Sequence, residues 1–352
     1  MTRLSASAVE TPWMPHQDQR LLDLSAWLEQ LLPEVFVRCG WGEVPAAQLT
    51  AASSDASFRR YFRWQGGERS LIVMDAPPPQ EDCRPFVKVA QMLDQAGVHV
   101  PQILASDLER GFLLLTDLGR QTYLDVIDQS NAEQLFEDAV EALLKFQLHP
   151  VAQPMPAYDE ALLRRELQLF PEWYVQRHLG HSFTEAQQAA WERICRQLID
   201  SALAQPRVLV HRDYMPRNLM ISEPNPGVLD FQDAVLGPVS YDITSLFKDA
   251  FLSWPEAQVR AWLEGYWHKA RAAGVSLPES LDEFLRASDL MGLQRHLKVI
   301  GIFARICHRD GKPRYLADVP RFFAYIEAVL ARRPELAELQ QLLAELPQAP
   351  HA

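Results

Sequence analysis

Two short polar clusters, each directly after an apolar stretch, carry residue types that suit phosphoryl transfer. Asp213 and Asn218 follow the apolar run 208–210, and Asp230 follows the run 228–229. Transfer of a phosphoryl group to a hydroxyl needs a carboxylate that receives the hydroxyl proton, and hard oxygen ligands for Mg²⁺. Asp213 suits the first task, and Asn218 and Asp230 suit the second.

The spacing of these residues is more specific than their types. Any one of them alone would be interpreted as a turn former, because Asp and Asn are common in loops. Residues 211–218 read H-R-D-Y-M-P-R-N, and residues 230–232 read D-F-Q. Kinase catalytic loops have the pattern H-R-D-x-x-x-x-N, followed by a metal-binding acid in a D-F sequence. The joint pattern predicts ATP-dependent phosphotransfer.

The first part of the chain predicts a small sheet with helices. Apolar residues recur at helical spacing over 21–32, and helical character returns over 86–95. Apolar or alternating runs predict strands over 58–64, 71–74, 103–104 and 112–115, with a hairpin turn at 65–68.

Helical patterns dominate after Gly119. Capping-box patterns predict helices opening at Ser130 and Thr184, a helical block is expected over 159–178, and helices continue from Tyr241 onward. The fold class is therefore α+β. We expect a nucleotide-binding lobe over residues 1–116, with a helical N-terminus and a small sheet. A helical lobe over 117–352 carries the catalytic and metal loops and the acceptor site.

Composition and charge indicate which partners and which compartment to expect. The 352 residues are 48% hydrophobic and 23% charged, as in ordinary folded proteins, and the net charge of -12 disfavours nucleic-acid or anionic-membrane partners. The four cysteines form no C-x-x-C pair, so we expect reduced thiols and no zinc ribbon. With neither a signal-like apolar segment nor an apolar stretch of membrane-spanning length, we expect a cytoplasmic protein; the pattern does not indicate an oligomeric state.

The two clusters belong to a recognisable set of motifs. Together with Gly237-Pro238 and Tyr241-Asp242-Ile243, they resemble the aminoglycoside phosphotransferase and choline kinase superfamily, which has a two-lobed protein-kinase-like fold. This resemblance implies ATP and Mg²⁺ as cofactors. It also implies that Asp242 is a structural residue that supports the catalytic loop.

Longer strings narrow the resemblance to one branch. They lie at 54–62, 71–78, 229–234 and 294–305, and resemble the bacterial kinases that phosphorylate the anomeric hydroxyl of N-acetylmuramate and N-acetylglucosamine in peptidoglycan recycling. The resemblance implies a small amino sugar as the partner molecule.

The chain departs from the kinase template where the nucleotide phosphates would bind. The segment expected to cover them holds Ser53, Ser54, Asp55 and Ser57 but no glycine, so main-chain N–H groups and serine hydroxyls would have to supply the donors.

The phosphate-binding lysine of the template is also replaced. Met74 stands in the strand where that lysine is expected, and no lysine precedes Lys88. Lys88 is our first candidate for the phosphate cation, with Arg60 or Arg63 as alternatives.

The acceptor site is expected in the helical lobe. N-acetylmuramate carries a lactyl carboxylate, for which Arg165, Arg295 and Arg305 are candidate partners. Further candidates for sugar contacts are Glu172 together with Glu166, Trp173 and Tyr174, whereas His178 and His181 are interpreted as surface residues.

Two other functions stay open at this point. A kinase of the same superfamily could act on an aminoglycoside, a choline-like compound or another amino alcohol, which the acidic composition permits. The missing strand lysine would instead fit a nucleotide-binding regulator without catalysis.

Overall fold

The structure, a computed structural model, describes residues 18–54, 58–151 and 154–347. Within these ranges the chain forms two compact units. The first runs to Arg120 and takes in Met220–Gln232, and the second comprises Gln121–Leu219 and the residues from Asp233 onward. The division expected after residue 116 differs from this grouping chiefly in the segment 220–232, which returns to the first unit.

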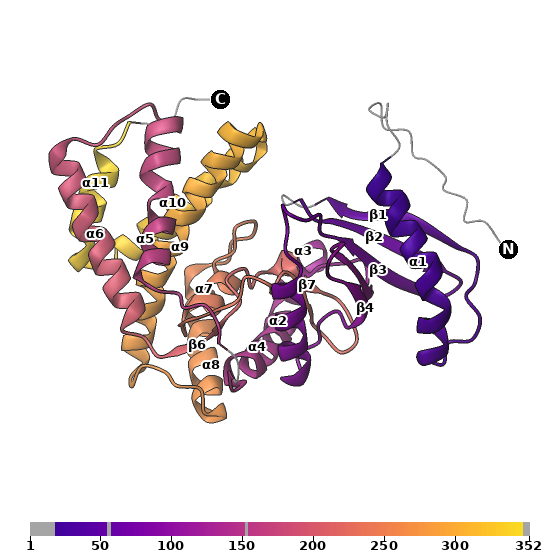
Figure 1. The fold of residues 1–352 in the computed structure, drawn as a ribbon. Helices are drawn as coiled ribbons and strands as arrows, with labels where there is room; N and C mark the ends of the chain where they lie inside the picture. The colour runs from indigo at the N-terminus through magenta and orange to yellow at the C-terminus, as the bar shows by residue number, and fades with distance from the viewer. Residues whose placement is uncertain (1–17, 55–57, 152–153, 348–352) are drawn as a thin grey trace. The chain divides into compact units, whose positions relative to one another are not determined.

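A five-stranded antiparallel sheet forms the body of the first unit (Figure 1), in the order β1-β2-β3-β5-β4. Its strands are β1 (Ala47–Ser54), β2 (Arg60–Gly66), β3 (Arg69–Asp75), β4 (Ile103–Asp107) and β5 (Phe112–Thr116). Helix α2 (Arg84–Gln95) lies in the chain between β3 and β4. The short strands β7 (Leu219–Met220) and β8 (Gly227–Val228) pair with each other. The expected strands and inserted helix are confirmed, but β1 was missed because alanine and serine dominate it.

Helix α1 (Gln19–Arg38) covers one face of this sheet. The Asp18 side chain caps its N-terminus. Its apolar stripe, which includes Trp27, is buried with Trp64 and Phe112 in a single hydrophobic cluster. Each large apolar side chain buried in this way contributes about 1.5–3 kcal/mol. Helix α1 is therefore part of the core of the first unit.

The second unit is mostly helical. Its first half contains α3 (Tyr123–Val126), α4 (Ala132–Leu148), α5 (Glu160–Leu167), η1 (Phe170–His178), α6 (Glu185–Leu203), β6 (Arg207–Val210), η2 (Pro216–Asn218) and β9 (Val235–Pro238). Its second half contains α7 (Tyr241–Phe247), α8 (Glu256–Ala273), α9 (Leu281–Asp310), η3 (Pro313–Asp318), α10 (Val319–Leu330), η4 (Pro334–Leu336) and α11 (Ala337–Ala344). Strands β6 and β9 form an antiparallel pair.

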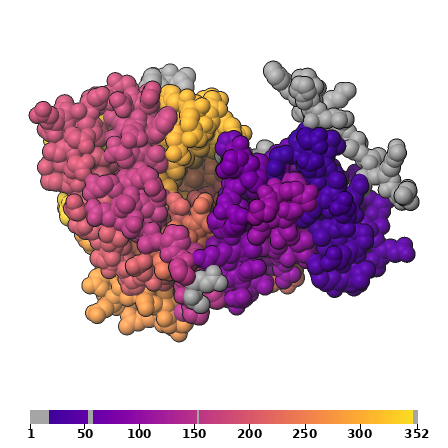
Figure 2. Space-filling model, in the orientation of Figure 1, coloured from indigo at the N-terminus to yellow at the C-terminus, as the bar shows by residue number. Residues whose placement is uncertain are grey.

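Helix α9 organises the second unit, because it packs against α5, α6, α7, α8, α10 and η1. A Cβ at Gly301 would clash with the main chain of Leu169, so a glycine lets α9 approach the α5–η1 segment closely. The space-filling view in Figure 2 shows the golden end of α9 beside the magenta α5–η1 segment, against which it packs.

Two local expectations are wrong. Ser130 does not cap α4: the N-cap is Asn131, and the Ser130 hydroxyl donates to Asp128 at 2.6 Å. The helical block over 159–178 is not a continuous α-helix, because its second part, η1, is π-helical. Pro171 lacks the N–H that an α-helical bond needs at this point. The capping box at Thr184 is confirmed.

A search of the described ranges for a helix both long and apolar enough to cross a membrane finds none.

Candidate active site

Residues 211–218 form a loop directly after β6, in the second unit. The Asp242 carboxylate, on α7, accepts hydrogen bonds from the main-chain N–H groups of His211 at 2.7 Å and Arg212 at 3.0 Å. His211 itself is fully buried. The structural role that the resemblance implies for Asp242 is therefore confirmed, since these bonds hold the start of the loop.

Burial has the largest effect on the pKa of Asp242. Burial, with the charge of Asp213 acting in the same direction, raises the pKa of Asp242 to about 7. The two main-chain donors and the Arg295 guanidinium act in the opposite direction but do not outweigh burial. The two main-chain hydrogen bonds to the loop therefore favour the charged form of a carboxyl that burial disfavours.

Arg212 adopts a left-handed backbone conformation directly before Asp213. Its φ angle is 79°, which is uncommon for a residue other than glycine and costs on the order of 1–3 kcal/mol. The Arg212 guanidinium donates to the buried carboxylate of Glu166, on α5, at 2.7 Å. Arg212 is thus held at both its main chain and its side chain.

The Asp213 carboxylate is half-buried and accepts no hydrogen bond from the residues that the structure describes. The main chain of Asp213 is fixed instead. Its N–H donates to His211 Nδ1 at 3.3 Å, and its carbonyl accepts the Asn218 side-chain amide at 2.8 Å. A carboxylate that no protein donor occupies can receive a proton from a bound hydroxyl.

Asp230 begins the second polar cluster, in the first unit. Its φ angle is 63°, and its Oδ1 accepts the side-chain amide of Gln232 at 2.8 Å. The next residue, Phe231, is fully buried, with its ring 4.9 Å from the ring of Phe86 on α2. This aromatic contact joins the turn that carries Asp230 to helix α2.

The segment expected to cover the phosphates lies between β1 and β2. Ser53 and Ser54 belong to the end of β1, where they pair with Tyr61 and Arg60. Asp55 and Ser57 lie outside the described residues. Phosphate binding by this segment stays a prediction.

The two arginines of β2 are held by carboxylates. Arg60 forms ion pairs with Asp75, at 2.5 Å, and with Asp18. Arg63 donates to the Asp117 carboxylate at 2.6 Å and also bonds the main chain of the segment after β5. These pairs tie β2 to its neighbours, which favours structural roles for both arginines over phosphate binding.

Helix α2 carries the remaining candidate for the phosphate cation. Met74, at the position of the template lysine, is fully buried on β3 opposite Tyr61 and Leu113. This position is therefore part of the apolar interior. Lys88 is half-buried on α2, the helix that Phe86 links to the Asp230 turn. Lys88 stays our prediction for this role.

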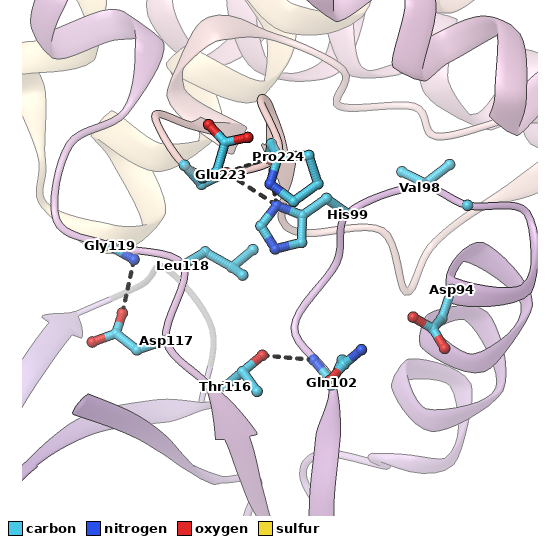
Figure 3. A pocket seen from close by; sticks show the side chains of 12 residues that line it. Asp94, Val98, His99, Gln102, Thr116, Asp117, Leu118, Gly119, Glu223 and Pro224 are labelled. Carbon is cyan, nitrogen blue, oxygen red and sulfur yellow. Dashed lines mark hydrogen bonds between the residues drawn. The ribbon is translucent and has the colours of Figure 1, made fainter. Parts of the chain in front are cut away.

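A cavity of about 630 Å³ borders the connector residues 116–119 in the first unit (Figure 3). Its wall includes His99, whose Nδ1 donates to the Pro224 carbonyl at 2.6 Å. Asp94, Asp117 and Glu223 also line it. Asp117 is paired with Arg63, but Asp94 and Glu223 would repel a polyphosphate, so we do not assign this cavity to the nucleotide phosphates.

The candidate sugar-binding residues lie in different environments. Arg295 is fully buried and donates to the Lys248 carbonyl at 3.2 Å, which favours a structural role. Arg165 and Glu172 are exposed, on α5 and η1. Two of the other candidates are interior residues: Glu166 pairs with Arg212, and the Tyr174 ring is buried.

Among the described residues Arg305 has no ion-pair partner, and a buried guanidinium nitrogen without a hydrogen bond distinguishes it from Arg165 and Arg295. It is half-buried on α9, and its Nε is buried without a hydrogen-bond partner in the described chain. Burial and the nearby charge of Arg309 lower the pKa of Arg305. A carboxylate brought by a ligand would supply the missing partner.

His178 at the end of η1 and His181 just after it each contact another side chain and do not indicate a metal site. His178 contacts His308 at 3.3 Å, and its pKa is lowered by burial and by that second histidine. Over 18–54, 58–151 and 154–347, no group of three or more His, Cys, Asp or Glu side chains could hold a metal ion.

Sequence reasoning missed Lys298, on α9. Its ammonium lies 3.0 Å from Glu166 and 3.1 Å from the Tyr241 hydroxyl. The available signal was the spacing of Lys298 four residues after Gln294, which puts both side chains on one helix face.

The chain belongs to the phosphotransferase enzyme family, whose model matches residues 48–284. It is 70% identical over 335 residues to the N-acetylmuramate/N-acetylglucosamine kinase of Pseudomonas aeruginosa, and the match covers 95% of this chain and 99% of that relative. It is 44% identical over 333 residues to the kinase of the same name from Neisseria meningitidis, covering 93% of this chain and 96% of that relative.

Solved structures show the same fold at low identity. The choline kinase LicA from Streptococcus pneumoniae matches with a TM-score of 0.58 at 13% identity, over 87% of this chain and 99% of that one. The gentamicin complex of APH(2'')-IIa matches with a TM-score of 0.58 at 15% identity, over 88% of this chain and 97% of that one. The predicted α+β kinase-like fold and the superfamily are confirmed, and the chain is a phosphotransferase.

Proposed function

We propose that this phosphotransferase is an ATP-dependent kinase that phosphorylates the anomeric hydroxyl of N-acetylmuramate and N-acetylglucosamine. The observation that carries the proposal is the 70% identity to a kinase named for these two sugars, over nearly the whole of both chains. The role in peptidoglycan recycling that the resemblance implies is part of the proposal. Because ATP is the donor, we assign the reaction to the cytoplasm.

Asp213 is the proposed catalytic base. Its carboxylate has no donor among the described residues, while its main chain is fixed by His211 and Asn218. It would orient the anomeric hydroxyl and receive its proton as the phosphoryl group is transferred. The anomeric hydroxyl is more acidic than other sugar hydroxyls, which suits a single aspartate as the base.

Asn218 and Asp230 are the proposed ligands of Mg²⁺. Their donor set of an amide oxygen and a carboxylate is one that hard cations accept. The Asn218 amide nitrogen donates to the Asp213 carbonyl, which turns the amide oxygen away from that carbonyl. When bound, Mg²⁺ neutralises charge on the transferring phosphate. Lys88 and the β1–β2 segment are proposed to contact the nucleotide.

The acceptor pocket is proposed to use Arg305, with Arg165 and Glu172 as further candidates. In the part of the chain that the structure describes, the half-buried Arg305 has no ion-pair partner and its Nε has no hydrogen bond, which suits the lactyl carboxylate of N-acetylmuramate. N-acetylglucosamine lacks that carboxylate, so this contact would distinguish the two sugars.

The experiment that tests the function is product identification. Purified protein is incubated with ATP, Mg²⁺ and each sugar, and the phosphorylated carbon is identified by phosphorus-coupled NMR. We expect sugar 1-phosphates from both. Phosphate on C6, or equal transfer to a sugar reduced at C1, would overturn the anomeric assignment and favour a broader small-molecule kinase.

A further inference from the structure

The buried Glu166 carboxylate forms a junction at which hydrogen-bond donors from the 211–218 loop and from other segments meet. One oxygen, Oε1, accepts from Arg212 at 2.7 Å and from Lys298 at 3.0 Å. The other, Oε2, accepts from the Tyr158 hydroxyl and from Gln294 at 3.1 Å. The side chain is 6% exposed, so water does not replace these partners. Four donors from the loop, α9 and the segment before α5 therefore converge on one carboxylate.

The charges around this junction keep Glu166 ionised. Burial alone would raise the pKa of its carboxyl, but the charges of Lys298 and Arg212 outweigh burial and lower the pKa to about 2. Burial in turn would lower the pKa of Lys298, and the charge of Glu166 outweighs it. A carboxylate that stays charged can hold a cationic guanidinium firmly.

Arg212 links this junction to the residue that follows it in the chain, Asp213. Arg212 has a φ of 79° and directly precedes Asp213 in the chain. Its main-chain N–H is fixed by Asp242, and its side chain by Glu166. If the guanidinium were released, the left-handed conformation would lose one of its two restraints, and the direction of the next side chain would change with it.

We propose that Glu166 is a positioning residue: by holding the Arg212 side chain, it fixes the orientation of the Asp213 carboxylate. The inference rests on the proposed role of Asp213 as the base. Lys298 and Gln294, both on α9, contact the same carboxylate. The position of the catalytic loop therefore depends on α9, the longest helix of the second unit, as well as on strand β6.

A purely structural role for Glu166 makes a different prediction. Glu166→Gln would leave the Lys298 ammonium buried without its counter-charge, which destabilises the fold whatever Arg212 does. Adding Lys298→Met removes that surplus charge. The double variant should regain thermal stability, but it still lacks the carboxylate that holds Arg212.

Asp289 provides a matched control. It is also a buried carboxylate, and it pairs with Arg332 at 2.5 Å and Arg333 at 2.9 Å on the same unit. It makes no contact with the 211–218 loop among the described residues. Asp289→Asn should therefore lower the melting temperature without changing the turnover of the folded fraction.

The test measures melting temperature, kcat and KM for ATP in Glu166→Gln, Glu166→Gln/Lys298→Met, Asp289→Asn and Asp213→Asn. We expect Glu166→Gln to lower kcat by about 10²-fold, the scale of a misplacement of about 1 Å, with KM for ATP within about two-fold of wild type. The double variant should recover melting temperature while kcat stays low.

Two results would overturn the inference. One is a kcat for Glu166→Gln within about two-fold of wild type, after correction for folded fraction, while Asp213→Asn is inactive. The other is a double variant that recovers kcat together with stability. If Asp213→Asn itself keeps full turnover, the proposed base is wrong, and that failure is distinguishable from the failure of Glu166 alone.

Discussion

Asp242 Oδ2 lies 2.7 Å from the main-chain nitrogen of His211, a residue 31 positions earlier in the chain. Because the same carboxylate also bonds the next main-chain N–H, helix α7 holds the junction between β6 and the following loop. The loop is therefore fixed from outside its own sequence, while the Asp213 carboxylate accepts no hydrogen bond from the described chain.

Asp213→Asn is expected to remove most turnover while leaving the fold and ATP binding nearly unchanged. An amide cannot accept the acceptor proton, and general-base contributions are typically about 10²–10⁴-fold. Steady-state kinetics and a nucleotide-binding titration measure the two effects. Turnover within a few-fold of wild type would reject the assignment.

Asn218→Ala and Asp230→Ala are expected to shift the Mg²⁺ dependence of activity to higher metal concentration, or to abolish activity. Each variant removes an oxygen ligand from a site with few protein ligands. The measurement is initial rate against Mg²⁺ concentration at saturating ATP. An unchanged titration in both variants would contradict the metal roles.

Lys88→Ala is expected to raise KM for ATP more than KM for the sugar. Arg60→Ala serves as the comparison, because its guanidinium pairs with Asp75 and Asp18 and should affect thermal stability more than nucleotide affinity. Should Arg60→Ala instead lose ATP affinity while Lys88→Ala behaves as wild type, the phosphate cation comes from β2.

Arg305→Gln is expected to reduce kcat/KM for N-acetylmuramate more than for N-acetylglucosamine, by about 1–3 kcal/mol for a charge-assisted hydrogen bond. Arg309→Gln, which removes the same charge from the exposed end of α9, is the control and should leave the ratio unchanged. Because the two sugars are compared in one variant, a general loss of stability cancels. Equal losses for both sugars would exclude the carboxylate contact.

Glu166 is expected to make folding stability depend on acid pH. Its folded-state pKa of about 2 lies below the ordinary value of 4.5, so its contribution is full above about pH 4.5 and is lost as pH falls toward 2. The stability difference between wild type and Glu166→Gln should shrink across this window by a few kcal/mol. Urea unfolding at stepped pH measures it. A difference that stays constant over the window would contradict the depressed pKa.

The candidate catalytic and metal-binding residues could be predicted from the sequence because they lie in short, continuous motifs. The roles of Asp213, Asn218 and Asp230 could be assigned from spacing because each cluster follows its strand directly. Helix α1 and the Thr184 cap were predictable because their signals repeat within one or two turns. The family match and the fold agree with that interpretation, while the individual site roles stay predictions.

Long-range pairings could not be predicted in the same way. Arg212 and Gln294 meet Glu166 from 46 and 128 residues away, and no local periodicity encodes such a meeting. The burial of Arg295 was missed for the same reason, since a helical arginine is normally exposed. The π-helical form of η1 was also missed, because its apolar spacing resembles that of an α-helix and only Pro171 marks the change.

Helix α1 lies entirely before residue 48, where the family match begins. Yet Trp27 and Leu28 share one hydrophobic cluster with Trp64 and Phe112, which lie inside the match. A fragment cut at the limits of the match would leave one face of the sheet bare and make it prone to aggregate. Chimaeras that exchange this unit between relatives should therefore transfer α1 together with the sheet.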